Sequence, residues 1–257
     1  MTEHVRIQIE SGVMRVLLAR PAKKNALTNA MYAALCDALA RAEREDEIRV
    51  VLFEAEGDAF TAGNDLGDFA AVASGTLARS DMRGTEFIRL LGRAQKPCVA
   101  AVQGIAVGIG VTLLLHCDLV FVAEDARLST PFVNLGLVPE AASTLLLPAR
   151  IGHARAYAMF ALGEAVDGRT AHALGLANAA LPRAHVRERA LQAARALAEK
   201  PAEALRETKR LMRDGEAILA AMAREGEVFA ARLKSAEAAE AFAAFAERRP
   251  PNFRALK

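Results

Sequence analysis

Aromatic residues are scarce in this chain of 257 residues, which has no Trp and only two Tyr. Proteins that bind single-stranded nucleic acid usually stack bases on aromatic rings, and few such rings are available here. The charge does not indicate binding of nucleic acid either, because 33 basic residues are balanced by 31 acidic ones and the net charge is only +2. We therefore expect no nucleic-acid partner.

Cysteine is also rare. Cys36, Cys98 and Cys117 make an odd number, and no two of them have the spacing of metal ligands. We interpret them as reduced, packed thiols of a cytoplasmic protein. The first four residues lack the basic and apolar parts of a signal peptide, which agrees with that location. The HExxH and CxxC motifs are missing as well, so we predict no metal site.

Long hydrophobic runs are limited to one segment, residues 99–115, which has a single strongly polar side chain. Its 17 residues are at the lower limit for a membrane-spanning helix. Three glycines interrupt it, and His116 and Asp118 follow directly. A buried strand, a turn and a helix explain this pattern better, so we expect no membrane partner.

Apolar residues make up 53% of the chain, which is enough to build a sizeable core. Period-two and helical patterns alternate through the first 150 residues, which predicts an α/β fold with crossover connections. Helical periodicity dominates afterwards, with a break at Lys200-Pro201. We therefore divide the chain into a core over residues 1–200 and a helical region over residues 201–257. The predicted strands are 4–9, 14–18, 49–54, 97–103, 119–123 and one near Leu128, and the predicted helices are 28–39, 82–93, 108–115, 202–213, 216–234 and 235–248.

Two glycine-containing loops directly follow predicted strands. Residues 60–66 read Phe-Thr-Ala-Gly-Asn-Asp-Leu, and residues 104–110 read Gly-Ile-Ala-Val-Gly-Ile-Gly. Glycine allows backbone conformations that direct N–H groups into a cleft, and the second loop opens a helix. Facing each other, the loops could hold a carbonyl oxygen between two N–H groups, as an oxyanion hole does. Either loop alone would fit an ordinary tight turn.

Other functions of a glycine loop are not supported. A dinucleotide fingerprint would need a third glycine at position 113, which is Leu113. The phosphate-binding loop would need Gly-Lys-Ser/Thr after the glycines, and the GxSxG motif of serine hydrolases is missing.

Glu140 is the one acidic residue in the apolar segment 128–148. Burial raises the pKa of a carboxyl group, which suits it to proton transfer near neutral pH. The alternative is an ordinary loop residue at the surface.

Four segments together resemble a known family. Residues 20–27, 60–66, 104–110 and 116–118 are similar to motifs of the crotonase (enoyl-CoA hydratase/isomerase) superfamily. The resemblance implies a crotonase-like spiral of ββα units with a C-terminal helical trimerisation region. It also implies a homotrimer or hexamer that acts on an acyl-CoA thioester without a separate cofactor.

The resemblance also implies functional positions. The backbone N–H groups of Ala62 and Ile109 would bind the thioester oxygen, and Ile109, where relatives commonly have Gly, would narrow the acyl pocket. The segment 82–91 is expected to line the acyl tunnel, with Phe87, Leu90 and Leu91 as candidates. The positions matched to binding of CoA or substrate are Ala22, Lys24, Ala26, Gly63, Asn64, Asp65, Leu66, Gly108, Gly110, Pro131, Phe245 and Arg248.

The type of reaction depends on the carboxylates. Hydratases of the family use two glutamates, at the positions of Thr112 and Phe132 in this chain. Glu140 instead matches the single acid of Δ3,Δ2-enoyl-CoA isomerases, which move a double bond by a 1,3 proton shift during fatty-acid β-oxidation. Two alternatives stay open: another crotonase reaction such as hydration or thioester hydrolysis, and a non-catalytic oligomer that binds acyl-CoA.

Overall fold

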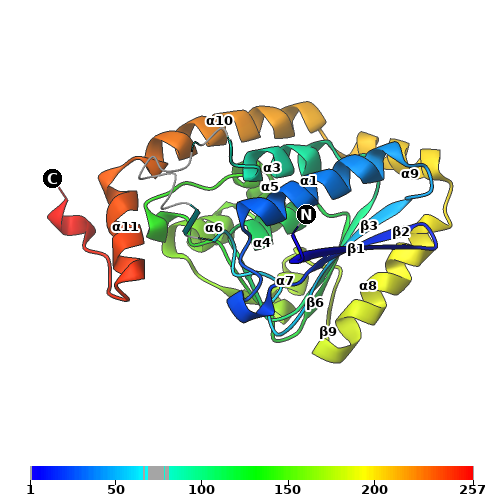
Figure 1. Ribbon diagram of the computed structural model, residues 1–257, viewed down its shortest axis with the longest axis horizontal. Helices are drawn as coiled ribbons and strands as arrows, with labels where there is room; N and C mark the ends of the chain where they lie inside the picture. The colour runs from blue at the N-terminus through cyan, green and yellow to red at the C-terminus, as the bar shows by residue number, and fades with distance from the viewer. Residues whose placement is uncertain (1, 66, 69–77, 79–80, 257) are drawn as a thin grey trace.

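The computed structural model describes residues 2–65, 67–68, 78 and 81–256. Its centre is a six-stranded sheet with the strand order β1-β2-β3-β4-β6-β9, beside which a three-stranded sheet has the order β5-β7-β8 (Figure 1). The strands are β1 Val5–Glu10, β2 Val13–Leu18, β3 Val50–Ala55, β4 Cys98–Val102, β5 Ile105–Val107, β6 Leu119–Ala123, β7 Arg127–Ser129, β8 Val166–Asp167 and β9 Ala179–Leu181.

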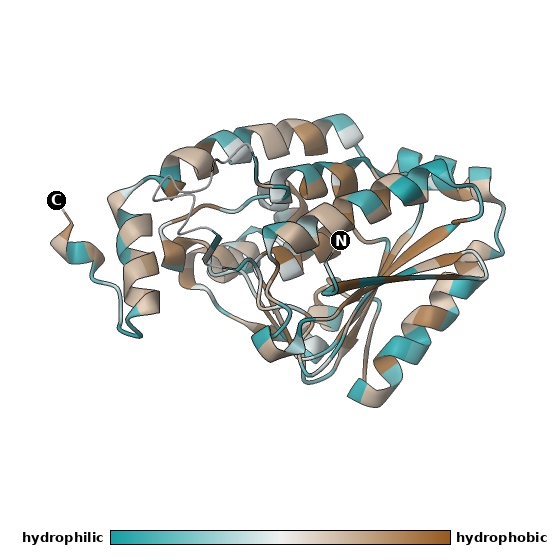
Figure 2. Ribbon diagram, in the orientation of Figure 1, coloured by the Kyte–Doolittle hydropathy of each residue, from teal (hydrophilic) through white to brown (hydrophobic). Residues whose placement is uncertain are grey.

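Strands β1 and β2 form the predicted antiparallel hairpin, and every other pair in the large sheet is parallel. Ser11 and Gly12 both have positive φ angles, 50° and 76°, as a tight hairpin turn requires. The central strands β3 and β4 are buried at every residue, because helices cover both faces of this part of the sheet. Burial on both faces explains why these strands are continuous apolar runs, which Figure 2 shows in brown.

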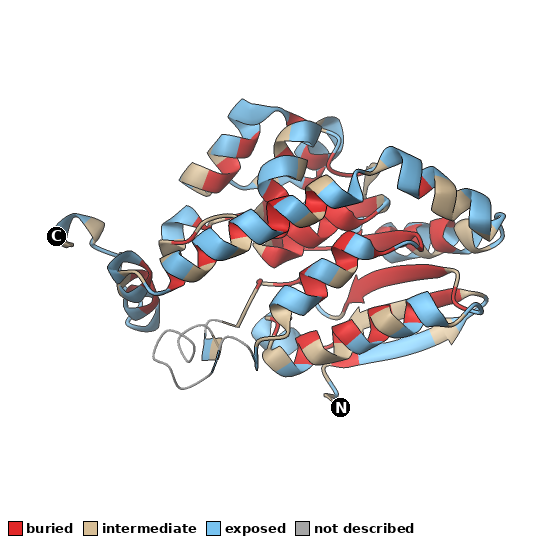
Figure 3. Ribbon diagram, turned by 90° about the horizontal axis from the view of Figure 1, so that it is seen from above, coloured by how far each residue is buried: buried red, intermediate tan, exposed pale blue. Residues whose placement is uncertain are grey.

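The helices surround this sheet, with exposed outer faces and buried inner faces (Figure 3). Helix α1 begins after Thr28, whose side chain accepts a hydrogen bond from the Met31 N–H, as its position in the sequence predicted. The α-helices are α1 Asn29–Arg44, α3 Gly84–Arg93, α4 Ile109–Thr112, α5 Ser143–Ile151, α6 His153–Tyr157, α7 Gly168–Ala173, α8 Arg183–Ala198, α9 Ala202–Met212, α10 Gly215–Leu233 and α11 Ala236–Ala246. Short 3-10 helices are η1 Pro21–Lys23, η3 Leu113–His116, η4 Val133–Leu135 and η6 Phe253–Ala255, and Ala158–Leu162 form a π-helix.

The C-terminal helices close one side of the core. Helix α10 packs against α3 and α5, and Phe229, Leu233 and Phe242 join the main hydrophobic cluster. Helix α11 and the C-terminal residues extend to the left in Figure 1. The predicted boundary at residues 200 and 201 coincides with the gap between α8 and α9, and the division into two parts stays a prediction.

Some elements differ from the sequence-based expectation. The predicted helix at 108–115 contains only one α-helical turn, Ile109–Thr112, and continues as the 3-10 helix η3. Strands β5, β8 and β9 were not predicted, because each has only two or three residues and shows no clear alternation. The α/β class and the C-terminal helical region are confirmed.

Candidate active site

The two glycine loops lie against each other and are joined by backbone hydrogen bonds. The Phe60 N–H donates to the Ile105 carbonyl at 3.0 Å, and the Val107 N–H donates to the Thr61 carbonyl at 3.0 Å. Close approach needs residues without a Cβ atom, because a Cβ on Gly110 would lie 2.6 Å from Cγ2 of Thr61. Facing loops were one of the two arrangements that the sequence left open, and this contact brings residues 62–65 and 107–109 to one cleft.

Two backbone N–H groups are available at this contact. Leu27 pairs with this segment by donating to the Gly63 carbonyl and accepting from the Asp65 N–H. Backbone groups of successive residues in an extended segment point in opposite directions, so the N–H of Asn64 points away from Leu27. Ile109 is the first residue of α4, where an N–H has no partner within the helix. No described residue accepts a hydrogen bond from either N–H, and both residues line the cleft. This pair of donors is suited to bind a developing oxyanion.

The prediction for Ala62 is corrected by this geometry. The Ala62 N–H donates a 2.8 Å hydrogen bond to the Lys24 carbonyl, so it cannot also bind a substrate oxygen in this conformation. The N–H of Asn64, two residues further along the same loop, is available instead. The motif located the loop, but only the hydrogen bonds identify which N–H in it is available.

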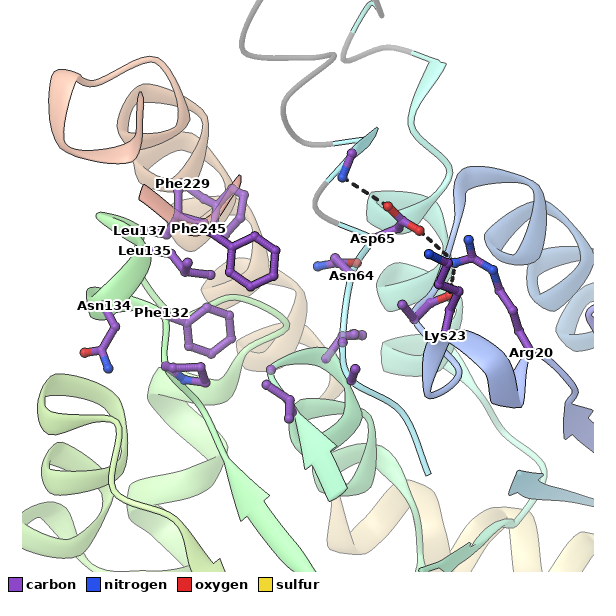
Figure 4. A pocket seen from close by; sticks show the side chains of 18 residues that line it. Arg20, Lys23, Asn64, Asp65, Phe132, Asn134, Leu135, Leu137, Phe229 and Phe245 are labelled. Atoms are coloured by element: carbon purple, nitrogen blue, oxygen red, sulfur yellow. Dashed lines mark hydrogen bonds and ion pairs between the residues drawn. The ribbon is translucent and has the colours of Figure 1, made fainter. Parts of the chain in front are cut away.

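The cleft has a volume of about 820 Å³ and two unlike sides (Figure 4). One side is apolar and includes Phe132 from the segment after β7 and Phe229 from α10. The other side carries Arg20, Lys23 and Asp65. A long amphipathic ligand, charged at one end and apolar at the other, fits such a cleft.

Asp65 belongs to the polar wall and is firmly held. Arg20 donates to its carboxylate at 2.7 Å and the Gly67 N–H donates at 3.0 Å. Partial burial raises the pKa of Asp65, but these hydrogen bonds outweigh it, and the net pKa lies below the usual value. Asp65 is therefore ionised and positions the loop, and it is not suited to carry protons near neutral pH.

Glu140 lies in a small cavity of about 40 Å³ that meets the cleft at Asn64, Ile109 and Phe229. Tyr32 lines the same cavity; its burial, followed by the negative charge of Glu140, raises its pKa well above the usual value. The Tyr32 hydroxyl donates to the Asn64 side-chain oxygen. The Glu140 carboxyl group and the two residues that supply the N–H donors thus border one cavity.

The positions at which a hydratase would have glutamates offer no acid. Thr112 is completely buried, and its hydroxyl has no hydrogen-bond partner among the described residues. Phe132 is part of the apolar wall. Asp65 and Glu140 are the carboxylates among the described residues that line the cleft and the small cavity.

The other predicted positions divide into two groups. Ala26, Gly63, Gly108, Pro131 and Phe245 line the cleft. Ala22, Lys24, Gly110 and Arg248 are not among its lining residues, and Leu66 lies outside the described residues. Their roles in binding stay predictions.

Several lining residues were not individually predicted. Arg20, Lys23 and Leu137 line the cleft. Met82 and Ile88 line the cavity of Glu140, and both lie in the segment 82–91 that was expected to line the acyl tunnel. Arg20 and Lys23 lie within a motif that the sequence did identify, so their charge was an available signal. Phe87 and Leu91 were expected in the acyl tunnel but belong to the core, because helical periodicity does not tell which apolar neighbour faces a cavity.

Other classes of site find no support within the described part of the chain. It contains no group of His, Cys, Asp or Glu side chains that could hold a metal ion. The three cysteines are free and buried. Among residues 2–65, 67–68, 78 and 81–256, no helix has the length and apolar character to span a membrane.

Known proteins resemble this chain over its whole length. A family model described as enoyl-CoA hydratase/isomerase matches residues 8–255. The 1,2-epoxyphenylacetyl-CoA isomerase of Escherichia coli K12 is 33% identical over 98% of this chain and 99% of that protein. Enoyl-CoA delta isomerase 2 of Rattus norvegicus is 33% identical over 96% of this chain and 64% of that protein. Proteins described as probable enoyl-CoA hydratases are about as similar, for example one from Rhodobacter capsulatus at 33% identity.

Solved structures show the same similarity in fold and sequence. The enoyl-CoA hydratase/isomerase from Pseudoalteromonas atlantica T6c superposes with a TM-score of 0.91, at 39% identity over 98% of this chain and all of that one.

Proposed function

The chain belongs to the enoyl-CoA hydratase/isomerase family, and on this premise we propose that it is a Δ3,Δ2-enoyl-CoA isomerase. One observation carries the choice of reaction. Glu140 borders the same space as the Asn64 and Ile109 N–H groups, while Thr112 and Phe132 occupy the positions of the two hydratase glutamates. A single carboxylate can move one proton between two carbons, whereas hydration needs both a base and an acid.

In the proposed reaction, the thioester oxygen of a 3-enoyl-CoA accepts hydrogen bonds from the Asn64 and Ile109 N–H groups. The Glu140 carboxylate removes a proton from C2, and the electron pair of the C2–H bond forms a C1=C2 double bond. The thioester C=O electrons move onto the oxygen, which gives a dienolate conjugated with the C3=C4 bond. The protonated Glu140 then delivers the same proton to C4, which leaves a C2=C3 double bond and regenerates the carboxylate. Each oxyanion donor typically contributes about 10²–10³ in rate.

The cleft supports a CoA ester as the ligand. Lys23 and Arg20 offer positive charge at its polar end, although Arg20 is already paired with Asp65. The apolar wall, which includes Phe132 and Phe229, suits the acyl chain and the pantetheine arm. This chemistry needs no cofactor besides the substrate itself.

An oligomer is part of the proposal. Large apolar side chains of α9 are unusually exposed for a single subunit: Leu211 is 77% exposed and Met212 is 83% exposed. Such side chains support an interface with another copy, and we propose the trimer or hexamer expected from the resemblance. A cytoplasmic location and a role in fatty-acid β-oxidation complete the proposal.

The test compares wild type with Glu140→Gln on 3-hexenoyl-CoA, following formation of 2-hexenoyl-CoA, with hydration of crotonyl-CoA measured in parallel. Loss of the proton carrier should lower kcat about 10²–10⁴-fold, as removal of a general acid–base group does. Glu227→Gln, an exposed change of the same kind, is the matched control. A Glu140→Gln variant as fast as wild type, or wild type that hydrates but does not isomerise, would refute the proposal.

A further inference from the structure

The backbone directly after Glu140 is in an unfavourable conformation. Ala141 and Ala142 have φ angles of +65° and +56°, in the left-handed region that residues with a Cβ atom rarely adopt. Two such residues in succession persist only where the surroundings impose the conformation. The shape of this turn decides where the Glu140 side chain points, so the groups that hold the turn also affect the position of the Glu140 carboxylate.

Glu225, on α10, holds one side of the turn. Its carboxylate accepts hydrogen bonds from the Ala142 N–H at 2.6 Å, from the Thr144 N–H at 2.9 Å and from the Thr144 hydroxyl at 2.5 Å. The residue is only 7% exposed, and its burial raises its pKa despite these hydrogen bonds. Ala142 has no side chain that could cap α5, so Glu225 supplies the cap from a distant part of the chain.

His116, at the end of η3, holds the other side. Its Nε2 atom lies 2.8 Å from the Ala141 carbonyl oxygen, and the Arg213 guanidinium hydrogen-bonds its Nδ1 atom. Arginine can only donate, so Nδ1 must be the acceptor and Nε2 carries the hydrogen that it donates to Ala141. His116 is 1% exposed, so its imidazole has almost no contact with water.

We propose that Glu225 and His116 are positioning residues that clamp the Ala141-Ala142 turn and thereby aim the Glu140 carboxylate at the substrate. The inference rests on the proposed function of Glu140. Neither residue lines the cleft or the Glu140 cavity, so neither touches the reacting atoms. His116 bonds to the carbonyl and Glu225 to the N–H of the peptide group that joins Ala141 to Ala142, and Glu225 also accepts from Thr144.

A clamp and an ordinary helix cap predict different kinetics. A cap that only stabilises the protein would change the melting temperature and leave kcat of the folded enzyme unchanged. A clamp sets the position of the proton carrier, and misplacing a catalytic group by about 1 Å can cost about 10²-fold in rate. Binding of the CoA ester depends on other walls of the cleft, so KM should change little.

The test uses Glu225→Gln, which keeps the size of the side chain but replaces one acceptor oxygen with a donor. We expect kcat for 3-hexenoyl-CoA isomerisation to fall about 10–100-fold, with KM within about two-fold of wild type. Hydrogen exchange of the peptide that contains residues 141–146 should become faster. Glu227→Gln, two residues away on α10 and exposed, should change neither kcat nor the rate of hydrogen exchange.

His116 offers a second, independent pair of variants. His116→Gln keeps an N–H that can reach the Ala141 carbonyl, whereas His116→Leu removes it. We expect His116→Gln to retain more kcat than His116→Leu at similar KM.

The outcomes separate this inference from the proposed function. If wild type isomerises and Glu225→Gln keeps its kcat, the clamp is refuted while the isomerase proposal stands. If wild type does not isomerise, the proposed function fails and the clamp, which rests on it, fails with it.

Discussion

The backbone N–H of Ala62 donates to the carbonyl of Lys24, which joins the loop before α1 to the first glycine loop. Lys24 itself is in the left-handed conformation, with a φ angle of +48°, and its side chain is exposed. Of the two lysines in this motif, Lys23 lines the cleft and Lys24 does not.

Lys23 and Lys24 should consequently differ in their effect on CoA binding. Replacing Lys23 with Ala should raise KM for the CoA ester several-fold, because an exposed contact between a cation and a phosphate contributes about 1 kcal/mol or less. The increase should shrink at high salt, where such contacts are screened. Lys24→Ala preserves the carbonyl that Ala62 uses and should leave KM near the wild-type value. Equal effects of the two changes would show that Lys24 also contacts the ligand, as the motif alone predicts.

Gly110 allows the two glycine loops to meet, and a side chain there should separate them. In Gly110→Ala, the new Cβ would lie 2.6 Å from Cγ2 of Thr61. We expect a loss of about 1–3 kcal/mol in the free energy of unfolding. Displacing an oxyanion donor should also lower kcat, by up to about 10²-fold. Urea unfolding and isomerisation kinetics measure the two effects.

A second substitution can relieve that clash selectively. Thr61→Ser removes Cγ2 but keeps the hydroxyl that donates to the Asn25 carbonyl at 2.7 Å. The double variant Gly110→Ala with Thr61→Ser should recover much of the lost activity. Gly226→Ala on α10, where a Cβ would meet nothing within 4 Å, serves as the matched control. Failure of Thr61→Ser to restore activity would mean that Gly110 matters for another reason.

His116 should make stability depend on pH. Burial, reinforced by the positive charge of Arg213, lowers its pKa from 6.5 to about 3. Below pH 6.5 the unfolded chain therefore binds a proton that the folded protein does not, and the free energy of unfolding falls as the pH falls from about 6.5 towards about 3. Above this window His116 is neutral in both states and contributes no pH dependence.

The His116→Gln variant lacks this titration and isolates the effect. Between pH 7 and pH 5, wild type should lose about 2 kcal/mol more than His116→Gln in the free energy of unfolding. Urea unfolding at both pH values measures the difference. Glu225 and other groups titrate in both proteins, so their contributions cancel. Equal losses in the two proteins would contradict a depressed pKa for His116.

Much of the fold was predictable because its signals are local. The hairpin turn at Ser11-Gly12, the Thr28 cap and the apolar run at 119–123 each depend on neighbouring residues. The very short strands β8 and β9 were missed, because pairing with distant strands, and not their own pattern, makes them strands.

Residue identity and spacing were enough to locate the two glycine loops, the isolated acid Glu140 and the lack of acids at positions 112 and 132. The folded chain was needed to see that the Asn64 N–H, and not that of Ala62, is available to a substrate oxygen. It was also needed to see that Glu225 and His116 hold the turn after Glu140. The physical reason is the same in both cases: a hydrogen bond between residues far apart in the sequence depends on the direction of each backbone group, which the chain acquires only when it folds.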